Sequence, residues 1–287
     1  MHINYLILSH SNYEHLSRLI NGLDDTNVEF FIHIDKKTDK MYETTKANVH
    51  ILKERSSIYW GGFGMISATL SLIKEARSYH NGGYYVLLSG VDYPIRSNRE
   101  VKEVLSEKKE FMNISLGPLP HKPIERYQYY YFDIDRRNPN GFRYIFFRML
   151  EKIQLKLKIK RKIPFKIYVG SQWFALTEDC IDYILKEIVD NPKYLIYFKH
   201  VFIPDEAFFH TILGNSNFYN KIEGNLTFVD WSVNPGPAII NESHLNIFQN
   251  NYSFKTKYGS NRPMFARKFD NNSQAIINKI NSTLRKD

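Results

Sequence analysis

The sequence predicts an α/β fold with a mostly parallel central sheet and helices on both faces. In residues 1–116, short apolar runs alternate with segments whose apolar residues recur at helical spacing. Repeated strand–helix units of this kind imply parallel strands that are buried on both faces. Polar residues follow several of the apolar runs, where ligands of parallel sheets bind.

Each element of this first half has its own local pattern. Apolar runs predict strands at Ile3–Leu8, Val28–Ile34, Val49–Leu52, Tyr84–Leu88 and Phe111–Ile114. A helix is predicted after the small polar residues 9–12, which suit an N-cap, because Leu16, Leu19 and Ile20 follow at helical spacing. Further helices are predicted at Thr38–Ala47, Ile66–Tyr79 and Asn98–Leu105.

Length and composition predict one folded domain over residues 1–287. The chain is 43% apolar and 15% aromatic, so burial of apolar surface can offset the entropy lost on folding. The single Cys180 excludes an internal disulfide and a cysteine-based zinc site. Met1–Asn4 shows no signal-peptide pattern and no apolar span of about 18 residues occurs, so we expect a cytoplasmic protein.

The net charge of +9 is concentrated in residues 143–166. This segment holds nine Lys and Arg against Glu151 alone, a charge of 9 − 1 = +8. Its apolar residues Phe142, Ile145, Phe146, Met149 and Ile153 follow helical spacing. The pattern has two interpretations. The segment could be a basic amphipathic surface that binds anionic lipid or a polyanionic acceptor, or it could be a solvated helix face followed by a basic loop. We do not expect nucleic-acid binding, because the charge is one local block without a nucleic-acid motif.

The common nucleotide-binding and metal motifs are absent from the sequence. Neither a P-loop nor a G-x-G-x-x-G fingerprint occurs, and there is no H-E-x-x-H. Gly61-Gly62-Phe63-Gly64 is a weak indication of close backbone approach to a ligand. Asp133-Ile134-Asp135 has metal-ligand spacing, but Arg136-Arg137 follow it, so we expect a local ion pair and no metal site.

The acidic pair in Pro204-Asp205-Glu206 lies within an otherwise apolar run. A carboxylate among aromatic residues loses water, which raises its pKa and makes it a better proton acceptor. Pro204 also suits the first turn of a helix, where the helix dipole favours acidic residues. The motif is therefore interpreted either as a general base or as an acidic helix start.

Seven segments, in the same order along the chain, resemble the core-2/I-branching enzyme family (glycosyltransferase family 14), above all its short bacterial members. The segments are Leu6-Ile7-Leu8-Ser9-His10, Ile32-His33-Ile34-Asp35-Lys36-Lys37, Trp60-Gly61-Gly62-Phe63, Leu87-Leu88-Ser89-Gly90-Val91-Asp92-Tyr93-Pro94-Ile95, Gly170-Ser171-Gln172-Trp173-Phe174-Ala175-Leu176, Pro204-Asp205-Glu206 and Phe265-Ala266-Arg267-Lys268-Phe269-Asp270.

The resemblance implies a GT-A-type, Rossmann-like fold and an inverting, metal-independent transfer from a UDP-sugar. It implies that Glu206 is the catalytic base and that Lys268 faces the diphosphate in place of a metal. It also implies that Asp35 contacts the uridine and that Trp231 packs against the acceptor sugar. Residues 1–116 would then form the nucleotide-binding half, and residues 117–287 the acceptor and catalytic half.

One departure from the family concerns the phosphate site. The family has a second cation between the Trp and Lys positions, whereas Asn234-Pro235-Gly236-Pro237-Ala238 contains none. We expect Arg262 or Arg267 to substitute.

Four further residues are expected at the site, each with a structural alternative. Asp92 and Trp60 are expected to contact the donor, although Asp92 also suits a turn and Trp60 also suits core packing. Asp205 and Trp173 are expected to contact the substrate, with packing as the alternative for Trp173.

The expected activity is transfer of N-acetylglucosamine, or else xylose, from the UDP-sugar to a glycan hydroxyl in bacterial surface polysaccharide synthesis. The expected partners are the UDP-sugar and a glycan or lipid-linked acceptor, with peripheral contact between residues 143–166 and the inner face of the cell membrane. Two alternatives stay open. The protein could bind sugar nucleotides or glycans without catalysis, or it could bind nucleic acid through residues 143–166.

Overall fold

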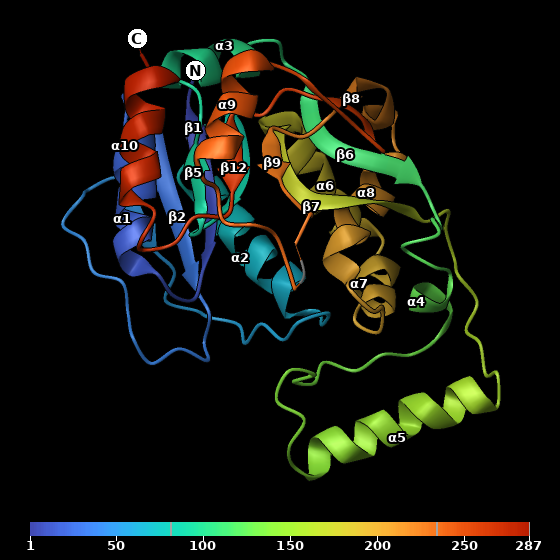
Figure 1. The fold of residues 1–287 in the computed structure, drawn as a ribbon. Coiled ribbons are helices and arrows are strands. Elements are labelled where there is room, and N and C mark those ends of the chain that lie inside the picture. The colour runs from blue at the N-terminus through green and yellow to red at the C-terminus, as the bar shows by residue number, and fades with distance from the viewer. Residues whose placement is uncertain (81, 234, 287) are drawn as a thin grey trace.

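A computed structural model describes residues 1–80, 82–233 and 235–286 and contains a seven-stranded sheet (Figure 1). The strand order is β3-β2-β1-β4-β7-β6-β8. Strands β1, β2, β3 and β4 are parallel to one another. Strand β7 is antiparallel to both of its neighbours, β4 and β6, and β8 is parallel to β6. The bounds are β1 Ile3–Ser9, β2 Val28–Ile34, β3 Val49–Ile51, β4 Tyr84–Ser89, β6 Glu110–Leu116, β7 Tyr168–Thr177 and β8 Ile222–Glu223. The predicted α/β fold with a mostly parallel sheet is confirmed, and β7 makes the sheet mixed.

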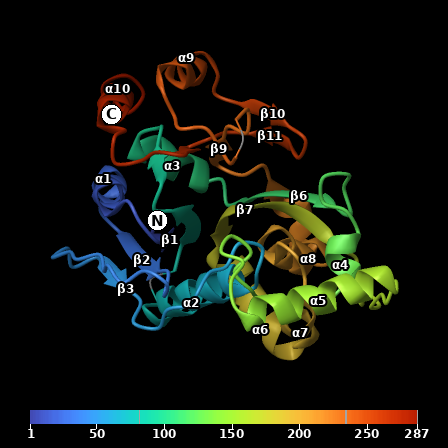
Figure 2. The ribbon, with the colours of Figure 1, turned by 60° about the horizontal axis from the view of Figure 1, so that its bottom comes forward.

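Helices cover both faces of this sheet because successive side chains of each strand point to opposite sides. In β1, Leu6 and Leu8 belong to the apolar cluster that contains α2 (Gly64–Ser78). Tyr5 and Ile7 belong to the cluster that contains α1 (Tyr13–Leu23) and α3 (Asn98–Leu105). Figure 2 shows α1 and α3 on one side of β1 and β2, with α2 on the other.

A second, three-stranded sheet of order β5-β12-β9 lies beside the main sheet, and a hairpin β10–β11 follows in the same region. Their bounds are β5 Asp92–Pro94, β9 Thr227–Val229, β10 Phe254–Thr256, β11 Gly259–Asn261 and β12 Phe265–Arg267. The remaining helices are α4 Glu125–Gln128, α5 Phe142–Lys156, α6 Glu178–Asp190, α7 Lys193–Phe198, η1 Pro204–Glu206, α8 Phe208–Gly214, η2 Asn217–Lys221, α9 Glu242–Asn250 and α10 Gln274–Thr283. Helix α5 is set apart from the sheet (Figure 1).

One predicted helix, Thr38–Ala47, is wrong. Tyr42 is the one buried residue of that stretch, so a helix there would bury almost no apolar face. Hydrogen bonds to α1 hold the segment as a loop instead: the Tyr42 hydroxyl lies 3.2 Å from the Ser17 hydroxyl, and Tyr13 donates to the Lys40 carbonyl. The other strands and helices predicted in the first half are present within a few residues of their expected bounds.

Candidate active site

A pocket of about 560 Å³ brings together two of the predicted site residues, Glu206 and Trp231. It is formed by β6 and β7 of the main sheet, the segment before α4, the end of β9 and the β10–β11 hairpin. Trp231 is 71% exposed, so its ring is available to a bound molecule. An exposed indole in the same pocket as a carboxylate suits recognition of a sugar, whose ring stacks on aromatic faces.

Glu206 is held by two cations that come from a distant part of the chain. Its Oε2 atom lies 2.7 Å from Nζ of Lys122 and 2.9 Å from Nη1 of Arg126. Lys122 is buried, and its ammonium group also donates to the Gly170 carbonyl oxygen at 2.5 Å. Burial lowers the pKa of Lys122, and the Glu206 carboxylate opposes this shift. The contacts position the carboxylate toward the pocket.

Sequence reasoning missed both of these cations. Lys122 and Arg126 stand about 80 residues before Glu206 in a segment without a recognisable motif. With no pattern linking the two segments, only the fold brings them together.

Burial, together with neighbouring charges, shifts the pKa values of the groups next to Glu206. Burial and then the Glu206 carboxylate raise the pKa of Asp205 to about 7. Burial, with Lys257 and Lys122 nearby, lowers the pKa of His121. Among the described lining residues, Glu206 is the one carboxylate in a pocket that also contains Lys122, Arg126, Lys255 and Lys257. The pocket is therefore basic overall, with one acidic group at its wall.

The glycine loop before α2 supports the Glu206 segment. The Gly61 carbonyl accepts a hydrogen bond from the Ile203 amide at 3.0 Å, next to Pro204. Gly61 has φ +77°, and a Cβ there would lie 2.7 Å from the Phe202 ring. Trp60 is 47% exposed and meets Phe202 edge to face, with ring centroids 5.4 Å apart. The glycines thus permit close approach to protein groups, and contact between Trp60 and the donor stays a prediction.

Replacing Gly61 with alanine is expected to destabilise the protein and lower its activity. The left-handed backbone costs about 1–2 kcal/mol for a residue with a Cβ, and the contact with Phe202 adds strain next to Glu206. Gly236→Ala is the control, because Gly236 also has a positive φ, of +83°, but a Cβ there would meet nothing within 4 Å. Thermal unfolding should show a larger loss for Gly61→Ala than for Gly236→Ala. Equal losses would show that the close contact with the Phe202 ring does not add to the destabilisation.

A second group of predicted residues lies where the small sheet meets the main sheet. Arg267 of β12 stands opposite Asp92 of β5 and Val229 of β9. Its Nε atom is 3.1 Å from Oδ1 of Asp92, and its guanidinium carbon is 4.0 Å from the ring centre of Trp173. Burial raises the pKa of Asp92 and lowers that of Arg267, and the two charges oppose these shifts. Asp92, Trp173 and Arg267 therefore form one cluster.

The strand ends adjoin this cluster. Asp35 is buried after β2, and its Oδ1 accepts hydrogen bonds from the Lys37 and Ile58 amides at 2.9 and 3.3 Å. Oδ2 of Asp92 accepts from the Ser89 amide at 2.8 Å, which supports the turn-forming interpretation of Asp92. Donor contacts of Asp35 and Asp92 stay predictions.

The predicted phosphate-site cations do not all lie together. The Lys268 amide donates to the Ala238 carbonyl at 3.2 Å, so the stretch where the family carries its second cation does lie against Lys268. Asn234 lies outside the described residues. Arg262 forms two hydrogen bonds of 2.7 Å with Glu107, and a longer ion pair with Glu223, away from Lys268. Arg267 is the nearer candidate, since it precedes Lys268 directly.

The local ion pair expected of Asp133-Ile134-Asp135 is wrong, because neither aspartate forms an ion pair within the part of the chain that the structure describes. Oδ1 of Asp135 instead accepts hydrogen bonds from the Arg137 and Asn138 amides, and Oδ1 of Asp133 lies so close to Gly62 that a Cβ there would be 1.9 Å from it. Across residues 1–80, 82–233 and 235–286, no three or more His, Cys, Asp or Glu side chains gather in a way that could hold a metal ion.

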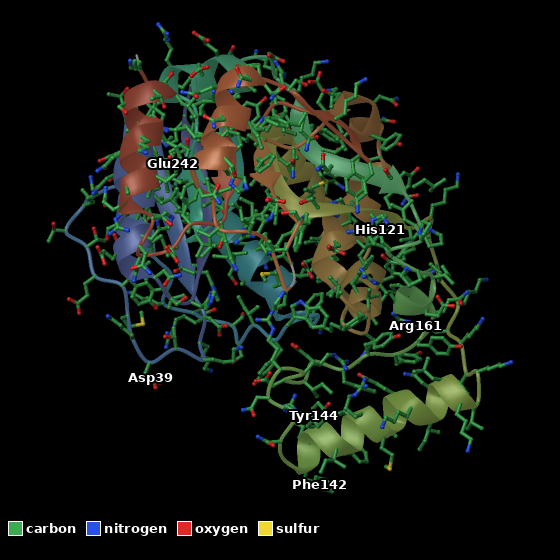
Figure 3. All side chains as sticks on the ribbon, in the orientation of Figure 1. Asp39, His121, Phe142, Tyr144, Arg161 and Glu242 are labelled. Atoms are coloured by element: carbon green, nitrogen blue, oxygen red, sulfur yellow. The ribbon has the colours of Figure 1, made fainter. Side chains whose placement is uncertain are left out.

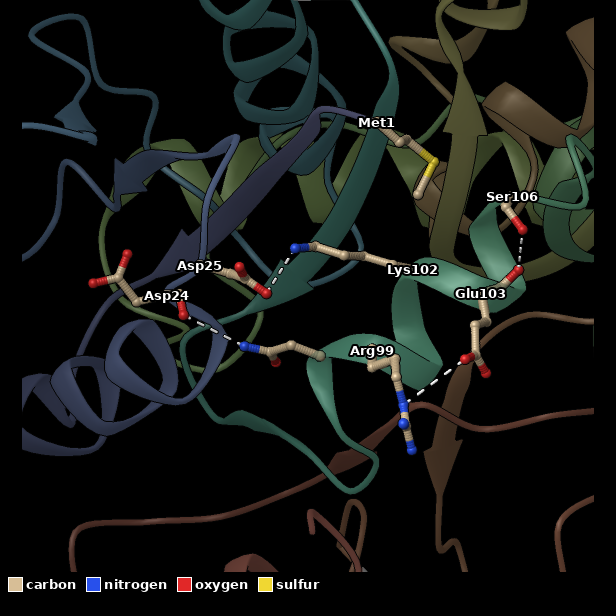
Figure 4. A pocket seen from close by; sticks show the side chains of 8 residues that line it. Met1, Asp24, Asp25, Arg99, Lys102, Glu103 and Ser106 are labelled. Carbon is tan, nitrogen blue, oxygen red and sulfur yellow. Dashed lines mark hydrogen bonds and ion pairs between the residues drawn. The ribbon is translucent and has the colours of Figure 1, made fainter. Parts of the chain in front are cut away.

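Another cavity, of about 740 Å³, lies at the opposite, N-terminal edge of the parallel strands (Figure 4). Its charged side chains pair with one another: Lys102 lies 2.7 Å from Asp25, and Arg99 lies 3.8 Å from Glu103. Ligands of parallel sheets bind at the other edge, so this cavity is not the candidate site.

Similarity to known proteins shows to which protein family this chain belongs. A family model described as Core-2/I-Branching enzyme matches residues 3–251. The mixed α/β sheet, with a polar pocket built partly from its strands, is compatible with a sugar-transferring enzyme. The chain belongs to the core-2/I-branching enzyme family, a family of glycosyltransferases.

The curated relatives are distant and much longer. Xylosyltransferase 2 of Mus musculus is 25% identical over 245 residues, which cover 80% of this chain and 26% of that protein. Xylosyltransferase 2 of Homo sapiens is 24% identical with the same coverage, and xylosyltransferase 1 of Rattus norvegicus is 24% identical over 76% of this chain and 26% of its own. The chain spans about a quarter of the length of these relatives.

Among solved structures, HddC from Yersinia pseudotuberculosis, complexed with GMP-PN, aligns at a TM-score of 0.29 and 16% identity, over 63% of this chain and 79% of that one. At this TM-score the alignment does not establish a shared fold.

Proposed function

We propose that this protein is an inverting, metal-independent glycosyltransferase of GT-A type that uses a UDP-sugar. The observation that carries the proposal is the pocket that joins the Glu206 carboxylate to the exposed Trp231 ring. The register of the small sheet supports it, because Arg267 stands beside Val229, which also lines the pocket. A donor held near Arg267 would thus lie next to an acceptor held in the pocket.

In the proposed reaction, Glu206 takes the proton of the acceptor hydroxyl. The acceptor oxygen then forms a bond to the anomeric carbon as the bond from that carbon to the diphosphate oxygen breaks. Attack from the side opposite the leaving group inverts the anomeric configuration. Lys268 and Arg267 stabilise the negative charge that develops on the departing UDP. Lys122 and Arg126 position Glu206.

The proposed donor sugar is N-acetylglucosamine or xylose, and the xylosyltransferase relatives support xylose. The proposed acceptor is a hydroxyl of a glycan or lipid-linked glycan in bacterial surface polysaccharide synthesis. We further propose a cytoplasmic location, with residues 1–116 as the nucleotide-binding half and 117–287 as the acceptor and catalytic half.

The test is a screen of UDP-sugars for hydrolysis and transfer in excess EDTA. We expect full activity, because cations of the chain take the place of a metal at the diphosphate. An absolute requirement for Mn²⁺ or Mg²⁺, restored when the ion is added back, would contradict the proposal.

Thermal unfolding separates the alternatives. UDP without metal should raise the melting temperature, whereas duplex DNA should not. Stabilisation by UDP without turnover of any UDP-sugar would favour a non-catalytic binding protein, and stabilisation by DNA alone would favour a nucleic-acid-binding protein.

A further inference from the structure

Helix α5 (Phe142–Lys156) turns its polar side toward the protein. Its two buried side chains are Glu151 and Gln154. Glu151 forms an ion pair with Arg136 at 2.5 Å, another with Arg148, and accepts the Phe132 amide at 3.0 Å. Glu151 and Gln154, together with the Phe147 ring, which stacks on Phe132 with centroids 4.5 Å apart, attach α5 to the rest of the molecule. A surface helix normally buries most of its apolar residues, whereas α5 leaves most of its own outside this contact.

The apolar side of α5 faces away from the protein. The exposed fractions are 82% for Phe142, 64% for Ile145 and 48% for Met149. Phe146 and Ile153, at 40% and 43%, complete a stripe at helical spacing, which we call the outer stripe. Figure 3 shows Phe142 on the outer side of α5 and Tyr144 on the side nearer the protein. Exposed apolar surface of this kind marks an interaction site.

Lysines border the outer stripe and continue beyond it. Lys152 and Lys156 lie one turn apart on α5, beside Ile145 and Met149 on the helix surface. The exposed lysines of the segment are Lys152, Lys156, Lys158, Lys160, Lys162 and Lys166. Within the part of the chain that the structure describes, none of them has an ion-pair partner, whereas Arg148 and Arg161 bind protein groups. The lysine charges are thus available to a partner.

We propose that α5 docks on an anionic lipid bilayer, with the outer stripe among the acyl chains and the lysines at the head groups. A bilayer interface accepts an apolar stripe and basic side chains along the same helix. A second copy of this chain would bring lysines against lysines, which repel. No helix in the described residues is long and apolar enough to cross a bilayer, so the contact would be peripheral.

The test is flotation of the full chain with phosphatidylcholine vesicles that contain or lack half phosphatidylglycerol. Wild type should bind the anionic vesicles, and salt should weaken the binding. Phe142→Ser/Ile145→Ser should reduce binding roughly tenfold or more. Its matched control is Val189→Ser/Ile196→Ser, which changes residues of 77% and 66% exposure on α6 and α7 and should leave binding unchanged.

The charge is tested by a second pair of variants. Lys152→Gln/Lys156→Gln should weaken binding to anionic vesicles about 25-fold, since each lysine near such a surface contributes about fivefold. Lys74→Gln/Lys199→Gln removes two exposed lysines elsewhere and should have little effect.

Three results would overturn the proposal: equal binding to neutral and anionic vesicles, binding unaffected by Phe142→Ser/Ile145→Ser, or a dimer in solution that this variant abolishes. Hydrolysis of a UDP-sugar in water measures the proposed enzyme activity separately. A variant that loses vesicle binding but keeps hydrolysis would therefore bear on the membrane contact alone and leave the proposed enzyme activity unaffected.

Discussion

Replacing Glu206 with glutamine is expected to slow sugar transfer by about 10²–10⁴-fold, while UDP affinity changes little. Glutamine keeps the shape of the side chain but cannot accept the proton of the acceptor hydroxyl. It also removes the charge that pairs with buried Lys122 and with Arg126, so thermal unfolding must accompany the kinetic measurement. The proposed base lies in the pocket with Trp231, where we propose that the acceptor binds, so binding of the nucleotide should not depend on it. Transfer is measured with saturating UDP-sugar, and UDP affinity by calorimetry.

Glu125→Gln is the control for this experiment. Glu125 is an exposed carboxylate on α4, next to Arg126, and lies outside the pocket lining. It should retain activity. A Glu206→Gln variant with nearly wild-type turnover would remove Glu206 from the mechanism, and a large loss in both variants would indicate disturbance of α4 rather than loss of a base.

Replacing Lys268 with alanine is expected to weaken UDP binding and slow transfer together, each roughly ten- to a hundredfold. A charge-assisted hydrogen bond to a phosphate contributes about 1.5–3 kcal/mol. The same cation would attract the bound diphosphate and stabilise the charge that grows on it as the glycosidic bond breaks. The Lys268 ammonium has no ion-pair partner among the described residues, so the substitution leaves no carboxylate unpaired.

Arg267→Ala is expected to act in the same direction with a smaller effect on UDP binding, because Arg267 already pairs with Asp92. Loss of that pair leaves a buried carboxylate, so thermal unfolding must accompany the measurement. Arg262→Ala should change UDP affinity least, since Arg262 is engaged by Glu107. The control Lys74→Ala removes an exposed lysine on α2. Unchanged UDP affinity in Lys268→Ala would place the phosphate site on other residues.

The strands and most helices of the first half could be predicted from the amino-acid sequence. Hydrophobic periodicity is a local property, and in Ile3–Ser9 or Gly64–Ser78 it agrees with the burial that the fold imposes. It failed at Thr38–Ala47, where local pattern is weak and hydrogen bonds to α1 decide the conformation. The acidic pair at 205–206 and Trp231 could be singled out because ordered motifs mark them.

The surroundings of these residues could not be predicted from the sequence, because they are formed by segments far apart in the chain. No motif connects Lys122 and Arg126 to Glu206, because ion pairs between distant segments leave no periodic trace in a sequence. In α5 the sequence showed an apolar and a basic side but not which side faces the protein. Contacts with distant residues decide this: the buried Glu151 pairs with Arg136, and Phe147 stacks on Phe132. They hold one side of α5 inward and leave the outer stripe in contact with solvent.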